Sequence, residues 1–131
     1  WFEFKKGKVV DFNSDSGKEI LEKYFAIDEG ASYLGEVALV DSSSEIFKSG
    51  LIFNSILFDE NAACHIALGR GIPVCLSNHK DLISPEIMKS NGCNYSLVHT
   101  DFMIGSDEVD VTGICENNNR IEIIRDGKFR V

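Results

Sequence analysis

The stretch "FDENAACHIALG", residues 58–69, opens with an aromatic residue and two acids, Asp59 and Glu60. An apolar segment follows directly, contains His65 and closes at Gly69. A short apolar run that ends at a glycine is typical of a buried strand. His65 then has two interpretations: a core histidine whose ring bonds a backbone carbonyl, or a metal ligand beside a carboxylate. Other parts of the chain are needed to decide between them.

Two further apolar segments carry acids or histidines. In "LGEVALV", residues 34–40, Glu36 lies inside an expected strand. In "VHTDFMIGS", residues 98–106, His99 and Asp101 stand two positions apart, so on a strand their side chains leave the same face. His-x-Asp is a familiar spacing of metal ligands. Taken singly, each segment also fits a strand whose polar side chains face water.

The three segments together favour a metal site. Glu36, Glu60 and Asp101 would repel one another by several kcal/mol per close pair at an effective dielectric constant near 20. None of the three segments contains a lysine or arginine, so a divalent cation is the simplest source of compensating charge. Carboxylate and imidazole ligands suit zinc, cobalt or manganese better than calcium. The third histidine, His79, lies in the polar sequence "LSNHKD" and is expected at the surface.

Length and composition limit the classes of function. The 131 residues fit one domain, and no linker or repeat divides them. A net charge of −8, from 13 basic and 21 acidic residues, argues against a nucleic-acid partner. No run approaches the ~20 apolar residues of a membrane span, so no membrane partner is expected. The cysteines form no C-x-x-C pair and are expected as free thiols in a reducing cytoplasm: Cys64, Cys75, Cys93 and Cys115.

The periodicity of the rest predicts an α+β fold with a mixed, largely antiparallel sheet and two or three helices. Ser16 and Glu19 have the spacing of a capping box for the first helix. The expected elements are a hairpin over 1–13, helices over 14–28 and 84–92, a possible short helix from Ser44, an apolar stretch 51–58 that fits either a helix or a strand, and strands over 96–105, 108–115 and 120–131.

The segments "LGEVALV", "LFDENAACHIALG" and "VHTDFMIGS", in this order and at these separations, resemble the aminopeptidase T and aminopeptidase S family of thermophilic metallo-aminopeptidases. The flanks "KKGKVVDF" and "IIRDGKF" match that family too, so the resemblance covers essentially the whole chain. It implies that residues 1–131 are a single domain, the C-terminal portion of the metal-binding catalytic region. The larger protein would be a two-domain α/β metallopeptidase whose N-terminal domain lies outside this chain. The first residue, Trp1, is not methionine, which fits an excised piece.

The resemblance also implies an activity and a set of ligands. The expected enzyme removes the N-terminal residue of peptides through a water that bridges two divalent ions, either zinc, cobalt or magnesium. Glu36 would be shared by the two ions, and a further glutamate ligand would lie upstream of Trp1. The general base stays open between Glu60 and that upstream glutamate, and no substrate-binding residue is assigned. By position, the implied metal ligands are Glu36, Glu60, His65, His99 and Asp101.

One position departs from the family pattern. Members usually carry a tyrosine seven residues after the motif histidine, and here that residue is Ile72, followed by Pro73. The chain would then lack a group that helps to bind substrate or to stabilise the transition state, unless the loop is rearranged. A metal-binding or oligomerisation module that has lost catalysis is therefore the alternative function. The full-length protein is expected to form a homodimer, and the isolated chain to be weakly active or inactive.

Overall fold

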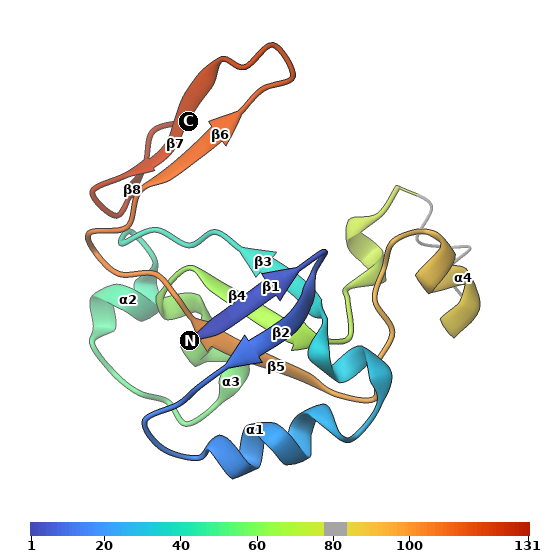
Figure 1. Ribbon diagram of the computed structural model, residues 1–131. Coiled ribbons are helices and arrows are strands. Elements are labelled where there is room, and N and C mark those ends of the chain that lie inside the picture. Colours follow the sequence, from blue (N-terminus) through green and yellow to red (C-terminus); the bar gives the residue numbers. More distant parts are fainter. Residues whose placement is uncertain (78–83) are drawn as a thin grey trace. The chain divides into compact units, whose positions relative to one another are not determined.

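The structure, a computed structural model, describes residues 1–77 and 84–131, and the position predicted for His79 lies outside them. The chain divides into two compact units. The first unit is Trp1–Val37 with Ile66–Thr100, and the second is Ala38–His65 with Asp101–Val131. Helices occur together with three small sheets in the described residues, which confirms the α+β class (Figure 1).

The first unit begins with the predicted hairpin. Strand β1 (Phe2–Lys5) pairs antiparallel with β2 (Lys8–Phe12), and a bulge shifts the register between Glu3 and Phe4. Lys6 and Gly7 join the strands with φ values of 52° and 78°. Positive φ at both central residues is what a tight two-residue hairpin requires, and glycine meets this requirement at little cost.

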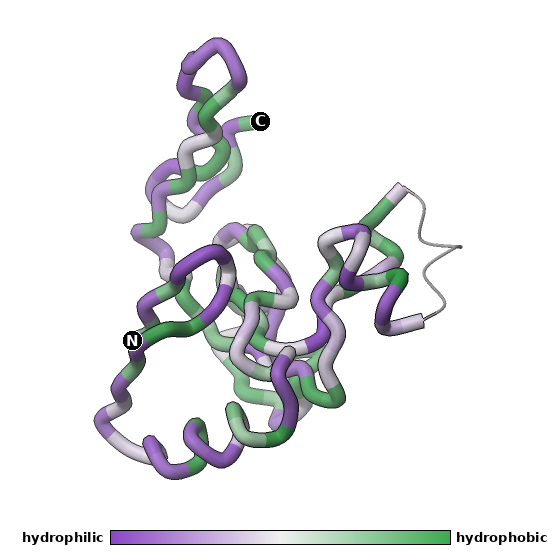
Figure 2. Tube along the Cα trace, turned by 45° about the vertical axis from the view of Figure 1, so that its right-hand side comes forward, coloured by the Kyte–Doolittle hydropathy of each residue, from purple (hydrophilic) through white to green (hydrophobic). Residues whose placement is uncertain are grey.

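Helix α1 (Lys18–Phe25) follows the hairpin, and hydrophilic and hydrophobic residues alternate along it (Figure 2). The predicted capping box is wrong, because the N-cap is Gly17 in the left-handed region and no side chain caps the helix. Phe25 packs against Phe12 with ring centroids 4.9 Å apart at 77°, an edge-to-face contact. The Tyr24 hydroxyl donates to the Leu68 carbonyl at 2.7 Å and ties the helix to a buried strand.

That buried strand is the centre of a three-stranded sheet. Its order is β3 (Leu34–Ala38), β4 (His65–Gly69) and β5 (His99–Met103). Four of the five β4 residues are buried, and Ile66 is half-buried. The apolar half of "FDENAACHIALG" therefore forms the predicted buried strand. Each of the three motifs that carry the predicted metal ligands therefore contributes one strand to the same sheet.

Tight backbone packing supports this sheet within the first unit. Gly30 lies in the 3-10 helix η1 (Glu29–Ser32), where a Cβ atom would stand only 2.0 Å from the Tyr95 carbonyl oxygen. The Asn94 side-chain amide donates to the Gly30 carbonyl at 2.8 Å and to the Gly69 carbonyl at 2.6 Å. Asn94 thus joins η1 to the end of β4.

We expect Gly30→Ala to lower the free energy of unfolding by about 3 kcal/mol, because the added methyl group meets backbone that cannot move away. Gly50→Ala is the control. Gly50 has a φ of 63° with nothing within 4 Å of a Cβ atom, so that substitution should cost only about 1 kcal/mol of backbone strain. Urea denaturation measures both variants, and equal losses would contradict the packing.

The remaining elements of the first unit are short. The 3-10 helix η3 (Pro73–Cys75) follows β4, and helix α4 (Pro85–Ser90) begins as predicted. Ser84 caps α4 by accepting a hydrogen bond from the Ile87 amide, and Pro85 occupies the first turn.

Short helices open the second unit. Helix α2 (Glu45–Ser49) starts after Ser44, as predicted. The ambiguous stretch 51–58 ends in helix α3 (Ile56–Asp59), which runs directly into the 3-10 helix η2 (Glu60–Ala62). Among the described residues there are four α-helices, two of them no longer than five residues.

An antiparallel sheet completes the second unit. Strand β6 (Val111–Ile114) pairs with β7 (Arg120–Arg125), which pairs with β8 (Lys128–Phe129). The single strand expected over 120–131 is thus two strands, because Asp126 and Gly127 turn the chain with φ values of 49° and 66°. The β6–β7 tip is hydrophilic (Figure 2).

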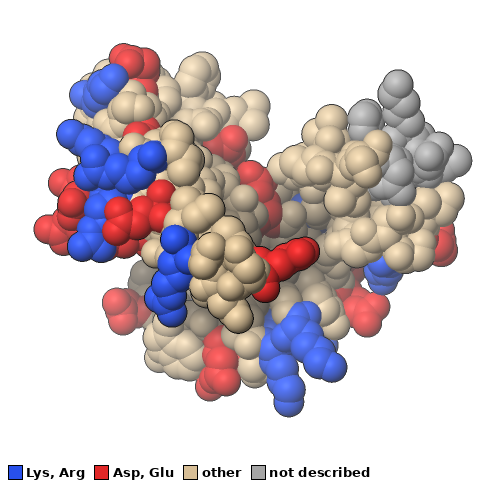
Figure 3. Space-filling model, turned by 90° about the horizontal axis from the view of Figure 1, so that it is seen from above, with Lys and Arg blue, Asp and Glu red and all other residues tan. Residues whose placement is uncertain are grey.

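The surface charges are mixed in sign, and the helices are short. Lysines and arginines lie interspersed with aspartates and glutamates on the face seen in Figure 3. In the part of the chain that the structure describes, every helix falls short of the length and apolarity needed to cross a bilayer.

All four cysteines are free thiols in the structure. Cys64 and Cys93 are buried, whereas Cys75 is exposed.

Candidate metal centre

The first unit brings Glu36 and His99 together. Glu36 lies on β3 and His99 on β5, and His99 Nε2 stands 3.4 Å from Glu36 Oε2. The Glu36 side chain is only 22% exposed, so it is not the solvent-facing edge residue of the alternative interpretation. Two motifs separated by more than sixty residues therefore meet at one carboxylate-imidazole pair.

A backbone carbonyl fixes the His99 ring. His99 Nδ1 lies 2.7 Å from the Arg70 carbonyl oxygen. A carbonyl oxygen can only accept, so Nδ1 carries the proton and donates it. In the neutral ring the lone pair then lies on Nε2, the atom that faces Glu36, and this is the tautomer in which a histidine binds metal through Nε2.

The second unit brings Glu60, His65 and Asp101 together. One potential ligand atom from each of these residues lies within 4.8 Å of the others. His65 is 3% exposed, and its Nδ1 donates to the Ala63 carbonyl oxygen at 3.0 Å. The ring is thus a buried core residue bonded to a carbonyl, and it also lies beside two carboxylates, so a role as metal ligand stays a prediction.

The two acids of the central motif have different surroundings. Asp59 accepts hydrogen bonds from the Phe53 amide at 2.8 Å and from the Ser55 amide at 3.0 Å, one on each carboxylate oxygen. Asn54, between those two donors, has a φ of 57°. Asp59 therefore closes the turn that leads into α3, while Glu60 lies with His65 and Asp101. The sequence "DEN" alone does not separate these roles, but the turn-forming pair Asn54 and Ser55 shortly before the acids is a signal for the role of Asp59.

Cys64 organises the backbone beside His65. Its carbonyl accepts hydrogen bonds from the amides of both Ile104 and Gly105, each at 2.9 Å. A Cβ atom on Gly105 would lie 2.7 Å from the Cys64 amide nitrogen, so only glycine permits this approach. The Cys64 thiol also donates to the Val40 carbonyl at 3.2 Å. The buried cysteine thus holds the segment after β5 against the start of β4, which places Asp101 near His65.

The donor set of the second unit suits a divalent ion. Two carboxylates and one imidazole are typical ligands of zinc and cobalt. Two ionised carboxylates 4.8 Å apart, the upper limit of the spacing within this cluster, repel each other by roughly 3 kcal/mol at an effective dielectric constant near 20. A cation between Glu60 and Asp101 would convert this repulsion into attraction. The residues present therefore fit a metal ion by their chemistry and spacing.

A family model described as thermophilic metalloprotease (M29) matches residues 1–129. The chain belongs to the M29 family of thermophilic metalloproteases. The M29 match spans all three motifs and both flanks quoted above, so the resemblance found in the sequence is confirmed.

Named relatives agree with M29 membership. The chain is 47% identical over 126 residues to "Aminopeptidase 2" of Geobacillus stearothermophilus, and 44% identical over 129 residues to "Aminopeptidase T" of Thermus aquaticus. These alignments cover 96% and 98% of the chain, but only 30% and 31% of the relatives. The solved structure "Wild-type AmpT from Thermus thermophilus" superposes with a TM-score of 0.82 at 42% identity, over 99% of this chain and 31% of that one. The chain thus spans about a third of the length of the M29 proteins that it matches.

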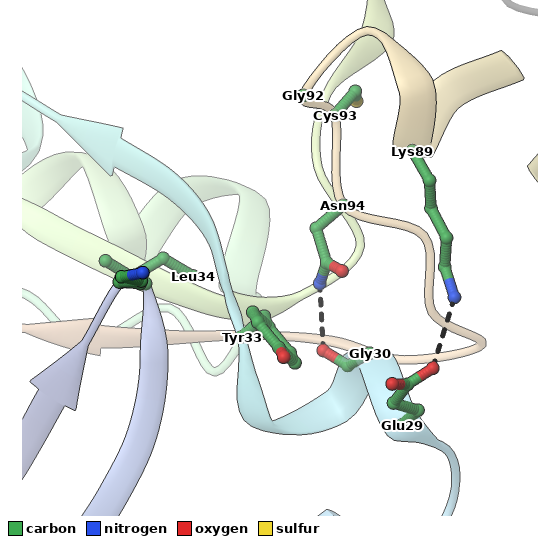
Figure 4. A pocket seen from close by; sticks show the side chains of 10 residues that line it. Glu29, Gly30, Tyr33, Leu34, Lys89, Gly92, Cys93 and Asn94 are labelled. Atoms are coloured by element: carbon green, nitrogen blue, oxygen red, sulfur yellow. Dashed lines mark hydrogen bonds and ion pairs between the residues drawn. The ribbon is translucent and has the colours of Figure 1, made fainter. Parts of the chain in front are cut away.

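The first unit also contains a cavity, whose lining includes Leu34 of the motif over residues 34–40. The cavity, of about 410 Å³, is also lined by Tyr33, Cys93 and Asn94, among others, with the Lys89–Glu29 ion pair of 3.4 Å at its side (Figure 4). Burial raises the pKa of the Cys93 thiol, which disfavours the nucleophilic thiolate. The cavity lining includes none of the five predicted ligands, so hydrolytic chemistry is better sought at the motif residues.

Ile72, the residue that departs from the expected family pattern, lies in the first unit. Ile72 is half-buried at the N-cap of η3, and Pro73 takes the first helical position. An aliphatic side chain offers neither a ligand atom nor a proton. Ile72 therefore supplies neither a hydroxyl group nor a metal ligand at this position.

Proposed function

We propose that the chain is the C-terminal catalytic portion of a metal-dependent aminopeptidase that hydrolyses the N-terminal bond of peptides. The observation that carries this proposal is the cluster of Glu60, His65 and Asp101, whose ligand atoms lie within 4.8 Å of one another. Membership of a metalloprotease family and relatives named as aminopeptidases support it. The activity of the whole protein is inferred here, since the chain spans about a third of those relatives.

The five motif residues are assigned as ligands of two divalent ions, zinc, cobalt or magnesium. Glu60, His65 and Asp101 bind one ion, and Glu36 and His99 contribute ligands to the second. Two observations support these assignments. His99 Nε2 lies 3.4 Å from Glu36 Oε2, and in both histidines Nδ1 donates a hydrogen bond to a backbone carbonyl. Because Nδ1 is the donor in both rings, Nε2 is the coordinating atom in both.

When bound, divalent ions act as Lewis acids on the scissile carbonyl and on the attacking water. The protein's own part is to hold its ligands in place. Ala63 and Arg70 orient the two imidazoles through their carbonyls, and the burial of His65 at 3% exposure keeps bulk water from competing for its ring. Glu60 and an upstream glutamate are the two candidates for the general base that takes a proton from water, and neither is assigned.

The test uses the full-length polypeptide, loaded with Co²⁺ or Zn²⁺, and a leucine p-nitroanilide substrate. We expect turnover that a chelator removes and that added metal restores. The Nα-acetylated form of the same substrate should be inert, because an aminopeptidase requires the free α-amino group. Turnover that persists in the chelator, or equal cleavage of the acetylated substrate, would overturn the proposal.

A second function is favoured by Ile72, which supplies no hydroxyl where the family usually has one. In this alternative the protein is a metal-binding or oligomerisation module without catalysis. The same assay separates the two functions when it is combined with elemental analysis. Stoichiometric bound metal without turnover indicates the module, whereas bound metal with turnover indicates the enzyme.

A further inference from the structure

We propose that Asp28 is a positioning residue that sets the place of His99, an inference that rests on the proposed function of His99 as a ligand. Asp28 lies seventy-odd positions earlier in the chain, outside the three motifs, and touches no predicted ligand. It acts through the backbone that enters β5. All of the residues concerned belong to the first unit.

The Asp28 carboxylate binds the segment directly before His99. Its Oδ2 accepts a hydrogen bond from the Leu97 amide at 2.7 Å, and its Oδ1 accepts one from the Ser96 hydroxyl at 2.9 Å. Oδ1 also accepts from the Ala31 amide at 2.9 Å, which fixes the carboxylate at the start of η1. Asp28 therefore joins a rigid turn of the chain to the two residues that lead into Val98 and His99.

Ser96 extends this connection by one residue. The Ser96 side chain is 1% exposed, and while its hydroxyl donates to Asp28, its oxygen accepts from the Val98 amide at 3.2 Å. The Val98 carbonyl then accepts from the Arg70 amide at 2.7 Å, and the Arg70 carbonyl accepts from His99 Nδ1 at 2.7 Å. A continuous chain of hydrogen bonds thus leads from Asp28 to the imidazole.

Close packing leaves this segment little room to adjust. A Cβ atom on Gly69 would lie 2.1 Å from the Val98 carbonyl oxygen, and Gly69 has a φ of 98°. The backbone of Val98 is therefore pressed against the end of β4. If the anchor at Asp28 is lost, the segment can move only away from β4, and this movement would carry His99 away from Arg70 and Glu36.

The charge of Asp28 is part of the anchor. The Leu97 amide is the largest influence that holds the pKa of Asp28 below its ordinary value of 3.8. The carboxylate is therefore ionised throughout the neutral range, and its hydrogen bonds weaken only as the pH falls through that lowered pKa. Asparagine has the same shape but one acceptor oxygen in place of two, so it cannot accept from both Leu97 and Ala31.

The experiment titrates full-length metal-free protein with Co²⁺ at pH 7 and follows the visible absorption of the bound ion. We expect Asp28→Asn to raise the Kd for Co²⁺ about tenfold, the lower end of the cost of losing a residue that orients a ligand. Glu29→Gln is the matched control, because Glu29 is the next residue and its ion pair with Lys89 is largely exposed. The control should keep the wild-type Kd and absorption spectrum.

Several outcomes decide the inference. A folded Asp28→Asn variant with the wild-type Kd and spectrum would overturn it, even if its melting temperature is lower, because a purely structural role changes stability alone. If Asp28→Asn does not fold, Ser96→Ala provides the test, since it removes the hydroxyl link to Val98 and should weaken Co²⁺ binding in the same direction. An unchanged Kd in that variant would also overturn the inference. If the wild-type protein binds no Co²⁺, the proposed function itself fails.

Discussion

His65→Ala is expected to remove metal binding and, with it, peptidase activity. His65 is the only imidazole among the three clustered residues predicted as ligands in the second unit, and its ring is buried at 3% exposure with Nδ1 bonded to Ala63. Loss of a ligand should exceed the loss of an orienting partner, so the Kd for Zn²⁺ should rise by more than about 100-fold. Calorimetric titration and elemental analysis measure binding, and the aminoacyl p-nitroanilide assay measures activity.

Two further variants make this result specific. His65→Gln retains a side-chain donor of similar reach for the Ala63 carbonyl, so it separates loss of the imidazole from loss of the hydrogen bond. His79→Ala removes the histidine that lies outside the three motifs, and it should leave metal content unchanged. Wild-type metal content in a folded His65 variant would reject the ligand assignment.

Glu60→Gln should chiefly weaken metal binding, whereas Asp59→Asn should chiefly lower stability. The two acids are neighbours, and each substitution removes one negative charge. Glu60 lies with His65 and Asp101, so its amide variant should weaken Zn²⁺ binding by about 100-fold. Asp59 bonds the amides of Phe53 and Ser55, so its variant should chiefly lose stability, by about 1–3 kcal/mol.

The comparison needs both measurements on both variants. Urea denaturation of the metal-free proteins gives the stability, and calorimetric titration with Zn²⁺ gives the affinity. We expect Asp59→Asn to bind Zn²⁺ far more tightly than Glu60→Gln and to unfold at lower urea. The reverse pattern would mean that the assignment of roles within the "DEN" triplet is wrong.

The sequence predicted those parts of the fold whose cause is local. The hairpin over 1–13 follows from alternation around Lys6 and Gly7, and α4 follows from Ser84, Pro85 and the closing glycine. The capping box failed because Gly17 adopts a left-handed conformation, which takes the N-cap position from Ser16. Residues 51–58 are apolar on both sides of Asn54 and Ser55, and such short apolar runs do not let periodicity separate helix from strand.

The candidate site was predictable to a similar degree. The sequence predicted that the three motifs meet, but not which residues pair; the structure places Glu36 beside His99, and Glu60 with His65 and Asp101. Their roles as ligands remain predictions. The proposed positioning role of Asp28 could not be predicted, because Asp28 and Leu97 are 69 positions apart and no local sequence pattern indicates so distant a hydrogen-bond partner.

The most direct test of the account is X-ray diffraction from crystals of the Zn²⁺-loaded protein, with data collected at the zinc absorption edge. We predict an anomalous peak about 2.0–2.2 Å from His65 Nε2 and from a carboxylate oxygen of both Glu60 and Asp101. Crystals that contain zinc elsewhere, with no peak among those three side chains, would contradict the central claim.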